Sequence, residues 1–336
     1  MEILETKYWQ LNSGDVTAAF AEAGALIRQG ELVAFPTETV YGLGANGLDG
    51  SAVKKIYLAK GRPGDNPLIL HIADLGQLAP LASELTPMAR MLAERFWPGP
   101  LTLVVKKSAL IPDEVSAGLD TVAVRFPSNE YARALIRAAG VPVAAPSANI
   151  SGRPSPTNAF DVQEDMAGRI AGILDGGPCQ VGLESTVVDT MGEFPVILRP
   201  GGITREMLQD LMGRVDLDPA LAGESAAVPR APGMKYKHYA PKAPMYLCRS
   251  QEILQQAVRT ALAEGKKVGV VAPLAVTGCI SQVYRDLPEL ANGLFYYLRE
   301  LDRKAVDVIY GLTVPEEGLG LAIMNRMRKS AGGKII

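Results

Sequence analysis

Six short apolar segments between residues 101 and 199 place the strongest constraint on the fold of this chain. Segments of this length, rich in β-branched residues, are typical of β-strands. Only one or two helical patterns are expected between them, so the strict strand–helix alternation of a doubly wound sheet is absent. The sequence therefore predicts an α/β fold with an open, twisted mixed sheet and flanking helices. The segments are LTLVV (101–105), TVAVRF (121–126), VPVAA (141–145), IAGIL (170–174), STVVD (185–189) and PVILR (195–199).

Helical patterns and two further strands surround these segments. Thr86-Pro87 is a typical cap and first residue for a helix whose buried face is expected to be Met88, Met91, Leu92 and Phe96. Residues 14–29 place apolar side chains on one helix face. The other expected elements are a helix at 51–60, strands at 31–36 and 68–72, and a closing helix at 204–212.

The glycines of Gly42-Leu-Gly44-Ala-Asn-Gly47 match the pattern of a dinucleotide-binding loop. Such a loop must follow a strand directly and open a helix, but PTETVY intervenes here. We interpret Asn46-Gly47 as a turn before a helix capped by Asp49 or Ser51. The chain also lacks a P-loop, so any nucleotide phosphates must be held by other groups.

The composition changes after residue 215. Residues 216–243 are rich in Pro, Ala and Gly, which is typical of a linker, yet they contain the donor-rich cluster KYKHY. From Met245 onward strand and helix patterns alternate, which predicts a small α/β domain with a parallel sheet. We therefore expect a first domain at 1–215, a linker at 216–243 and a second domain at 244–336.

Composition and charge exclude several classes of protein. The 336 residues carry 34 Lys and Arg against 36 Asp and Glu, a net charge of −2, and 48% are hydrophobic. This balance excludes a disordered chain and a globally basic nucleic-acid coat. No apolar run approaches the ~18 residues of a membrane span, so no membrane partner is expected. The start MEILETKYWQ lacks the apolar core of a signal peptide.

Cysteine and histidine usage narrows the chemistry further. The three cysteines form no C-x-x-C pair, which argues against a zinc ribbon or a disulfide framework. With two histidines in the chain, a histidine-rich metal site is excluded. We expect a cytoplasmic protein in a reducing compartment.

Lys60 and Arg62 are the first candidates for a functional site. Lys60 shares the apolar face of its predicted helix with Val53 and Ile56, so both cations are expected to point inward. Buried cations need anions, and Arg and Lys are the residues that hold oxyanions. The alternative is that both side chains reach the surface along their aliphatic stems.

Hydroxyl-rich loops after predicted strands provide the second group of candidates. PTETVYGLG (36–44) and APSANISGRPSPT (144–157) place Thr, Ser and Asn side chains where loops commonly carry ligand groups. Ser185 and Arg199 each lie at a strand end. Self-capping turns would explain the hydroxyls equally well. Together with the cations, however, these residues favour a cavity that positions and neutralises a polyphosphate.

Seven segments in this order resemble the Sua5/YrdC/YwlC family of threonylcarbamoyl-AMP synthases. They are PTETVYGLG, KGRPGDNPL, WPGPLTLVV, TVAVRFP, APSANISG, LESTVVD and LRPGGIT. APGMKYKHYAP, followed by a small α/β domain that ends in GLGLAIMNRMRKSA, is similar to the long, Sua5-type members. The resemblance implies a YrdC-like open sheet with a large, positively lined cavity and a Rossmann-like second domain.

The resemblance also implies site residues. The tetrad that holds nucleotide phosphate would be Lys60, Arg62, Ser147 and Asn149. The positions that match a threonine site are Thr37, His71, Arg125, Ala145 and Ser185. The further nucleotide contacts would be Asn66, Thr121, Ser155, Arg199, Tyr236 and His238, with the choice between the last two left open. The resemblance also implies that the linker at 216–243 folds over the cavity as a lid.

The implied reaction converts L-threonine, bicarbonate and ATP into threonylcarbamoyl-AMP and pyrophosphate, with Mg²⁺ carried by the ATP phosphates. The product would pass to the machinery that makes N6-threonylcarbamoyladenosine (t6A) at position 37 of tRNA, and a weak contact with tRNA itself is a further expectation. Two alternatives are an RNA-binding module and a carbamoyltransferase that uses carbamoyl phosphate. The net acidic charge argues against the first, and the absence of accompanying acylphosphatase and zinc-finger segments argues against the second.

Overall fold

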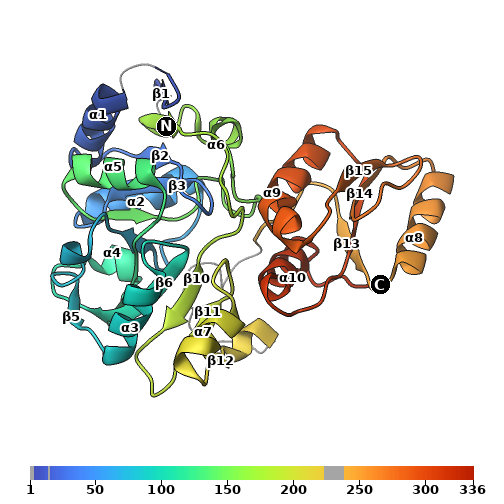
Figure 1. Cartoon of the computed structure of the whole chain (residues 1–336). Coiled ribbons are helices and arrows are strands. Elements are labelled where there is room, and N and C mark those ends of the chain that lie inside the picture. The colour runs from blue at the N-terminus through green and yellow to red at the C-terminus, as the bar shows by residue number, and fades with distance from the viewer. Residues whose placement is uncertain (1–3, 14–15, 223–237) are drawn as a thin grey trace.

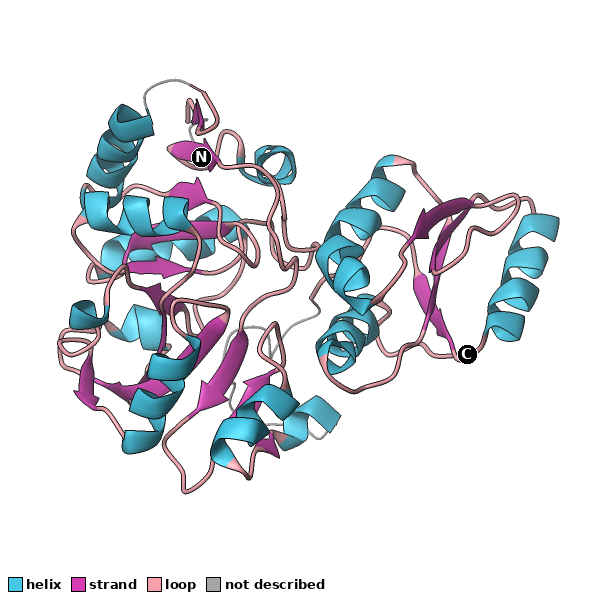
Figure 2. Cartoon of the chain, viewed as in Figure 1, coloured by secondary structure: helices cyan, strands magenta, loops and turns pink. Residues whose placement is uncertain are grey.

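The computed structural model describes residues 4–13, 16–222 and 238–336, which form two α/β domains (Figure 1). The first domain is built on a large sheet, and the second on a small sheet with helices on both faces (Figure 2). The second domain turns two of its helices, α9 (Leu287–Arg303) and α10 (Leu319–Ser330), toward the first domain, while α8 (Gln251–Ala263) lies on the far side (Figure 1).

The helices of the first domain are α1 (Val16–Arg28), α2 (Gly50–Lys60), α3 (Pro87–Phe96), α4 (Asp113–Ser116), α5 (Glu130–Ala139), α6 (Ala159–Met166) and α7 (Arg205–Met212), with 3₁₀ turns η1 (Leu75–Gln77) and η2 (Pro219–Ala222). Its strands are β1 (Lys7–Gln10), β2 (Val33–Phe35), β3 (Gly42–Asn46), β4 (Ile69–His71), β5 (Ala82–Glu84), β6 (Leu101–Lys107), β7 (Thr121–Arg125), β8 (Val143–Ala145), β9 (Gly172–Asp175), β10 (Thr186–Asp189), β11 (Val196–Arg199) and β12 (Asp216–Leu217).

Within the described residues these strands form one 12-stranded sheet in the order β1-β9-β2-β3-β8-β4-β7-β6-β10-β11-β12, with β5 beside β6. The sheet is mixed. For example, β4 pairs parallel with β7 and antiparallel with β8. The mixture of parallel and antiparallel neighbours confirms the predicted mixed α/β fold. Antiparallel neighbours need no helical crossover, so strands and helices do not alternate strictly along the chain.

The two faces of the large sheet differ, and this difference positions the site. The largest core cluster packs one face against α2, α3, α4, α6 and α7. On the other face α1 and α5 cover only the part near β2, β8 and β9. Side chains two residues apart on a strand share a face. His71 and Arg125 therefore lie on the same face as Ile69 and Ala123, whose small apolar cluster contains no helical residue.

The second domain has an all-parallel sheet, as its sequence predicts. Its strands β13 (Met245–Cys248), β14 (Val268–Ala272), β15 (Ile280–Val283) and β16 (Val308–Leu312) run in the order β13-β16-β14-β15. All three pairings are parallel. Such a sheet needs cover on both faces, and α8 supplies it on one side while α9 and α10 supply it on the other.

The two domains share a core. Val40 and Leu183 of the first domain belong to the same buried cluster as Phe295 of the second. Polar contacts surround this cluster. The guanidinium of Arg299 donates to the carbonyl of Pro154 at 2.7 Å and pairs with Asp165 at 2.8 Å. The domains are therefore joined by a packed interface with buried charge pairs.

Two sequence expectations were wrong in detail, and one strand was missed. Three helices, α4, α5 and α6, interrupt the six segments instead of one or two. Met91 is 44% exposed, and Ala89, Leu92, Ala93 and Phe96 form the buried face of α3. Gly42–Asn46 is a strand, β3, that was not expected, while the turn at Asn46-Gly47 and the Asp49 cap of α2 are confirmed. A Cβ on Gly42 would lie 3.0 Å from the ring of Phe35, so glycine here permits close strand packing.

None of the helices among the described residues is long and apolar enough to cross a membrane.

Candidate active site

Two adjoining pockets lie between the uncovered sheet face, the loop after β8 and the segment at His238 and Tyr239. The first, which we call the cationic pocket, is lined by Lys60, Arg62, Ser147, Asn149, Ser151, Gly152, Arg153, Ser155, Glu184, Arg199, His238 and Tyr239. The second, the threonine-rich pocket, is lined by Thr37, Thr39, Val40, Gly42, His71, Arg125, Ala145, Pro146, Ser147, Glu184, Ser185 and Arg199. Ser147, Glu184 and Arg199 line both.

Lys60 is the last residue of α2 and is 98% buried, with 2% of its surface exposed. Its ammonium donates to the carbonyl oxygens of Ser147 at 2.6 Å and Asn149 at 2.7 Å. Burial, reinforced by the charge of Arg62, lowers the pKa of Lys60 well below its ordinary value. An anion bound in the pocket would raise the pKa of Lys60 again, because a nearby opposite charge favours the ionised form.

The loop after β8 holds its polar groups through short local bonds. The hydroxyl of Ser147 donates to Oδ1 of Asn149 at 2.6 Å. The amide nitrogen of Asn149 donates to the carbonyls of Ile150 at 2.8 Å and Arg153 at 3.0 Å. Since Lys60 donates to two carbonyls of the same loop, hydrogen bonds join the end of α2 to the hydroxyl-rich loop.

Arg199 ends β11 and lies in the wall between the two pockets. Its Nε donates to the carbonyl of Ser185 at 3.1 Å, and Nη2 donates to the hydroxyl of Ser185 at 3.1 Å. The same hydroxyl lies 2.7 Å from that of Thr102. Burial lowers the pKa of Arg199 to about 10, so the guanidinium remains charged near neutral pH.

The threonine-rich pocket is nearly neutral. Arg125 ends β7 and pairs with Glu38 at 2.7 Å, while its other amino group donates to Thr39 at 2.8 Å. His71 lies beside Arg125 in register, and burial together with the Arg125 charge lowers its pKa to about 3. The imidazole is therefore uncharged near pH 7. Thr37 closes a turn by donating to the carbonyl of Val40 at 2.6 Å.

Glu184 is buried where the two pockets meet. Its Oε1 accepts from the hydroxyl of Ser155 at 2.6 Å, and its Oε2 accepts from Nε of Arg326 at 2.9 Å. Burial alone would raise the pKa of Glu184, but the charges of Arg326 and Arg199 and the Ser155 hydrogen bond outweigh it and lower the pKa to about 2. The carboxylate is thus ionised and a weak base.

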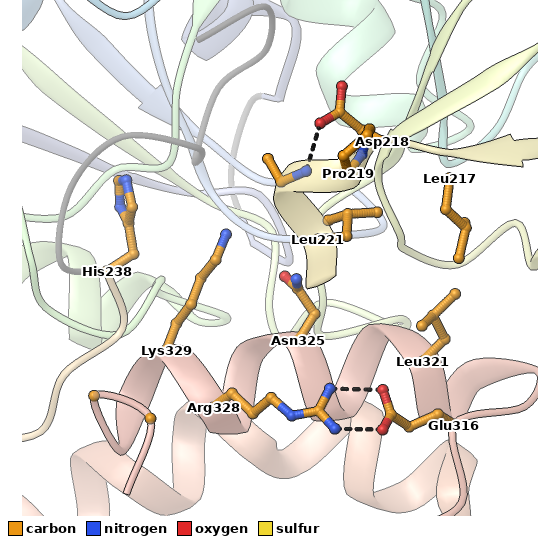
Figure 3. Close-up of a pocket in the computed structure, with 13 residues that line it drawn as sticks. Leu217, Asp218, Pro219, Leu221, His238, Glu316, Leu321, Asn325, Arg328 and Lys329 are labelled. Atoms are coloured by element: carbon orange, nitrogen blue, oxygen red, sulfur yellow. Dashed lines mark hydrogen bonds and ion pairs between the residues drawn. The ribbon is translucent and has the colours of Figure 1, made fainter. Parts of the chain in front are cut away.

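His238 connects the cationic pocket with a larger cavity between the domains. This cavity has a volume of about 960 Å³, whereas the cationic and threonine-rich pockets have about 40 Å³ each. In Figure 3 Asn325 and Lys329 project from α10 toward the space below η2, with His238 at its side. Arg328 lies along the helix, held by Glu316. Burial and the charge of Lys329 lower the pKa of His238 to about 3.

The structure brings together most of the residues that the sequence singled out. All five residues of the expected threonine site line one pocket. The expected phosphate tetrad lines the other, together with Ser155, Arg199 and His238. Asn66 and Thr121 line neither, and Tyr236 lies outside the described residues. Asn66 is fully buried, and neither polar atom of its amide has a hydrogen-bond partner among the described residues.

Sequence reasoning missed Glu184, Tyr239 and Arg326. Glu184 had a signal, since it is a charged residue directly before the apolar run of β10. Tyr239 stood next to a residue already chosen. Its ring stacks on Phe295 of the second domain with centroids 5.0 Å apart, so its role at the interface depends on tertiary structure. Arg326 had no local sequence signal, because its partner Glu184 is 142 residues away in the chain.

Oxygen groups in the cationic pocket fit a magnesium ion that arrives with a nucleotide. The described residues contain no group of three or more His, Cys, Asp or Glu side chains that could hold a metal ion by themselves. Hydroxyl and amide oxygens such as those of Ser147 and Asn149 suit the outer ligands of Mg²⁺ bound to phosphates.

Comparison with known proteins agrees with this arrangement. Residues 25–201 match the Sua5/YciO/YrdC family, described as "Telomere recombination", and residues 203–332 match the Sua5 C-terminal family, described as "Threonylcarbamoyl-AMP synthase, C-terminal domain". The chain is 50% identical over 320 residues to the threonylcarbamoyl-AMP synthase of Pyrococcus abyssi, covering 94% of each chain. It is 48% identical over 347 residues to that of Bacillus subtilis, covering 99% of this chain and 100% of the relative.

A solved structure shares the complete two-domain arrangement. The crystal structure of P. abyssi Sua5 complexed with L-threonine superposes with a TM-score of 0.94 at 48% identity, covering 98% of both chains. Family, fold and domain order thus agree over nearly the whole sequence. The chain belongs to the Sua5/YciO/YrdC family of threonylcarbamoyl-AMP synthases, in its two-domain form.

Proposed function

We propose that this protein makes threonylcarbamoyl-AMP and pyrophosphate from L-threonine, bicarbonate and ATP. The observation that carries the proposal is the pair of adjoining pockets with a common wall. One gathers Lys60, Arg62 and Arg199, as a polyphosphate requires. The other is nearly neutral and lined by hydroxyl groups, as a zwitterionic amino acid with a hydroxyl side chain requires.

The threonine-rich pocket is the proposed site of L-threonine, which is the ligand of the P. abyssi structure. Ala145 and Thr37 would surround the small side chain, and Ser185 and His71 offer neutral polar groups. Arg125 would face the carboxylate. Its charge is balanced by Glu38 in this structure, so it would contribute orientation more than net charge.

The cationic pocket is the proposed site of the ATP phosphates. Lys60, Arg62, Ser147 and Asn149 would hold them, with Ser155 and Arg199 along the wall. Nε2 of His238 is buried and has no hydrogen-bond partner among the described residues, and the same is true of the Asn66 amide. Such atoms are costly unless a ligand satisfies them, which supports His238 as a nucleotide contact because it lines the pocket. Asn66 lines neither pocket and is proposed on the family resemblance. Thr121 and Tyr236 remain proposed nucleotide contacts on the family resemblance alone.

The reaction can be written in two steps. The threonine amine attacks the carbon of bicarbonate and loses a proton, water leaves, and a carbamate forms. A carbamate oxygen then attacks the α-phosphate in line, and pyrophosphate leaves with the electron pair of the broken P–O bond. Lys60 and Arg62 neutralise the charge that develops on the phosphates. Among the described residues, no strong general base lines the two pockets. Orientation of the two substrates would therefore supply most of the rate acceleration.

Mg²⁺ is proposed as the companion of ATP, with Ser147 and Asn149 beside it. When bound, it would supply further neutralisation of phosphate charge.

Residues 216–243 are proposed as a linker and lid between domains at 1–215 and 244–336, and residues 223–237 of this segment lie outside the described residues. Within it, β12 and η2 at 216–222 extend the first domain. The cationic pocket has room for only a few water molecules at about 40 Å³, so its walls must move to admit ATP. His238 and Tyr239 form one of these walls. Closure would protect the carbamate from water.

The proposed place of the reaction is the cytoplasm. There the labile adenylate would pass to the machinery that places t6A at position 37 of tRNA, with a weak tRNA contact as a further proposal.

Pyrophosphate release from ATP tests the proposal directly. Release that requires both L-threonine and bicarbonate, with serine and valine as controls and a threonylcarbamoyl adenylate seen by mass spectrometry, is the expected result. Release with carbamoyl phosphate in place of bicarbonate and ATP would favour the carbamoyltransferase. Folded protein that binds RNA with steep salt dependence and releases no pyrophosphate would favour the RNA-binding module.

A further inference from the structure

The wall shared by the two pockets contains a charge of the wrong sign for a phosphate site. Among the described residues that line the pockets, Glu184 is the one carboxylate, and it lines both. A carboxylate that faced bound phosphates without a counter-charge would oppose their binding, and the effect is large where water is excluded. The structure must therefore neutralise Glu184 if the cationic pocket is to hold ATP.

Arg199 contributes positive charge from the first domain, and the ion pair of Glu184 with Arg326 adds a second cation from the second domain. Arg326, in the middle of α10, is fully buried and donates from Nε to Oε2 of Glu184 at 2.9 Å. Its Nη1 donates to the carbonyl of Pro200 at 2.8 Å, and the ring of Tyr239 lies 5.7 Å from the guanidinium. Arg326 lines neither pocket, so any effect on a ligand must act through Glu184.

Both partners of this pair are held in place. Oε1 of Glu184 is occupied by the Ser155 hydroxyl, which leaves the carboxylate little freedom to turn. The planar guanidinium contacts Glu184 and Pro200 together, which a lysine ammonium could not reproduce with the same geometry. Breaking a buried ion pair by removing one partner leaves an uncompensated charge, and this is far more damaging than replacing both partners.

We propose that Arg326 is a positioning residue for the reaction: it neutralises and orients Glu184, and so allows the second domain to complete the phosphate site of the first. The proposal rests on the proposed function. It assigns the second domain a direct part in ATP binding and predicts that the damage caused by losing Arg326 depends on the charge of Glu184.

The test compares R326M, E184Q and the double variant R326M/E184Q with the wild type. The readout is the KM for ATP and for L-threonine in pyrophosphate release. R326M is expected to raise the KM for ATP about tenfold or more, with a smaller change for L-threonine, because a buried unpaired carboxylate repels phosphates. The double variant is expected to recover most of that loss, since the glutamine carries no charge.

Arg303→Met provides the matched control. Arg303 also crosses the domain interface, from α9 to Asp161 and Glu164 of α6, but neither of these partners lines the two pockets. Its variant is expected to keep the wild-type KM for ATP. If R303M raises this KM as much as R326M does, the effect belongs to the interface in general and the proposal is overturned.

Arg326→Lys covers the case in which R326M does not fold. Lysine keeps the positive charge but cannot contact Glu184 and Pro200 together as the planar guanidinium does. We therefore expect an intermediate rise in the KM for ATP, which E184Q should again relieve. Failure of E184Q to relieve the loss in whichever arginine variant folds overturns the inference alone. A wild type that releases no pyrophosphate with threonine and bicarbonate overturns the proposed function, and the inference with it.

Discussion

The two pockets share three lining residues, yet they differ in how far their cations are paired with carboxylates. In the cationic pocket the ammonium of Lys60 is held by carbonyl oxygens and forms no ion pair within the described part of the chain. In the threonine-rich pocket Arg125 is paired with Glu38 at 2.7 Å, and His71 is neutral. The first pocket therefore offers positive charge to a ligand, while the second offers shape and neutral polar groups.

This difference has a simple physical basis. A polyphosphate has several negative charges, so its site gains from cations that are poorly compensated before binding. An amino acid has no net charge, so its site gains little from unpaired charge and most from close fit. Glu184 lines both pockets, and its negative charge is unfavourable for a bound polyphosphate. Arg326 of the second domain forms an ion pair with it and balances that charge.

The largest effect is expected at Lys60. Lys60→Met removes the buried cation while keeping the side-chain volume, and pyrophosphate release should fall at least about 100-fold, as when one preorganised charge-stabilising donor is lost. Lys55→Met, on the same helix but partly exposed and paired with Glu31, should retain full activity. A K60M enzyme within a few fold of wild type would show that charge does not distinguish the two pockets.

Lys60 also supports the fold of the loop after β8. Its loss leaves the carbonyls of Ser147 and Asn149 without their donor, so thermal unfolding of K60M should show a destabilisation of about 1–3 kcal/mol.

Shape should dominate in the threonine-rich pocket. Ala145→Val adds two methyl groups to a pocket of about 40 Å³, and overpacking of about 1–3 kcal/mol should raise the KM for L-threonine roughly tenfold. The KM for ATP should change less. Ala144→Val is the matched control, because Ala144 is equally buried in the same strand but packs into the core on the opposite face. Equal effects of both variants on threonine would argue against a pocket selective by shape.

The low pKa of Glu184, in the wall shared by the pockets, predicts that the free energy of unfolding depends on pH. The pKa of Glu184 is about 2 in the folded protein against an ordinary value of 4.5, so its ionisation contributes stability above pH ~4.5 that is lost as the pH falls toward 2. The difference corresponds to roughly 3 kcal/mol. Urea unfolding between pH 2 and 7 should show a smaller acid-induced loss for E184Q than for wild type. Parallel curves would mean that Glu184 is not held as the structure indicates.

The smallest effect is expected at His71. Its pKa of about 3 keeps the ring neutral from pH 5.5 to 8, so the profile of threonine KM against pH should be the same for wild type and His71→Gln. An imidazole signal that titrates near pH 6.5 by NMR would contradict this. The unfolded chain would still protonate this histidine below pH ~6.5, so its contribution to stability should fall as the pH drops.

Local patterns in the sequence were enough to place most elements. The cap formed by Thr86 and Pro87, the apolar face of residues 16–28 and the strands of the second domain all follow from short-range periodicity. Helix α5 was missed although Asn129 caps it and Gly140 ends it at φ 68°, both readable signals. Strand β3 was missed because its glycines are explained by packing against Phe35, a contact that local sequence does not show.

By itself, the sequence determined the fold class, the two-domain order and the residue types that gather in the two pockets. These depend on periodicity and on motifs, which act over a few residues. The tertiary structure decided how the charges are balanced. Lys60 binds carbonyls 87 and 89 residues away, Glu38 neutralises Arg125 across 87 positions of the sequence, and Arg326 reaches Glu184 from the other domain. Electrostatic energy depends on distance and burial, and both are properties of the folded chain.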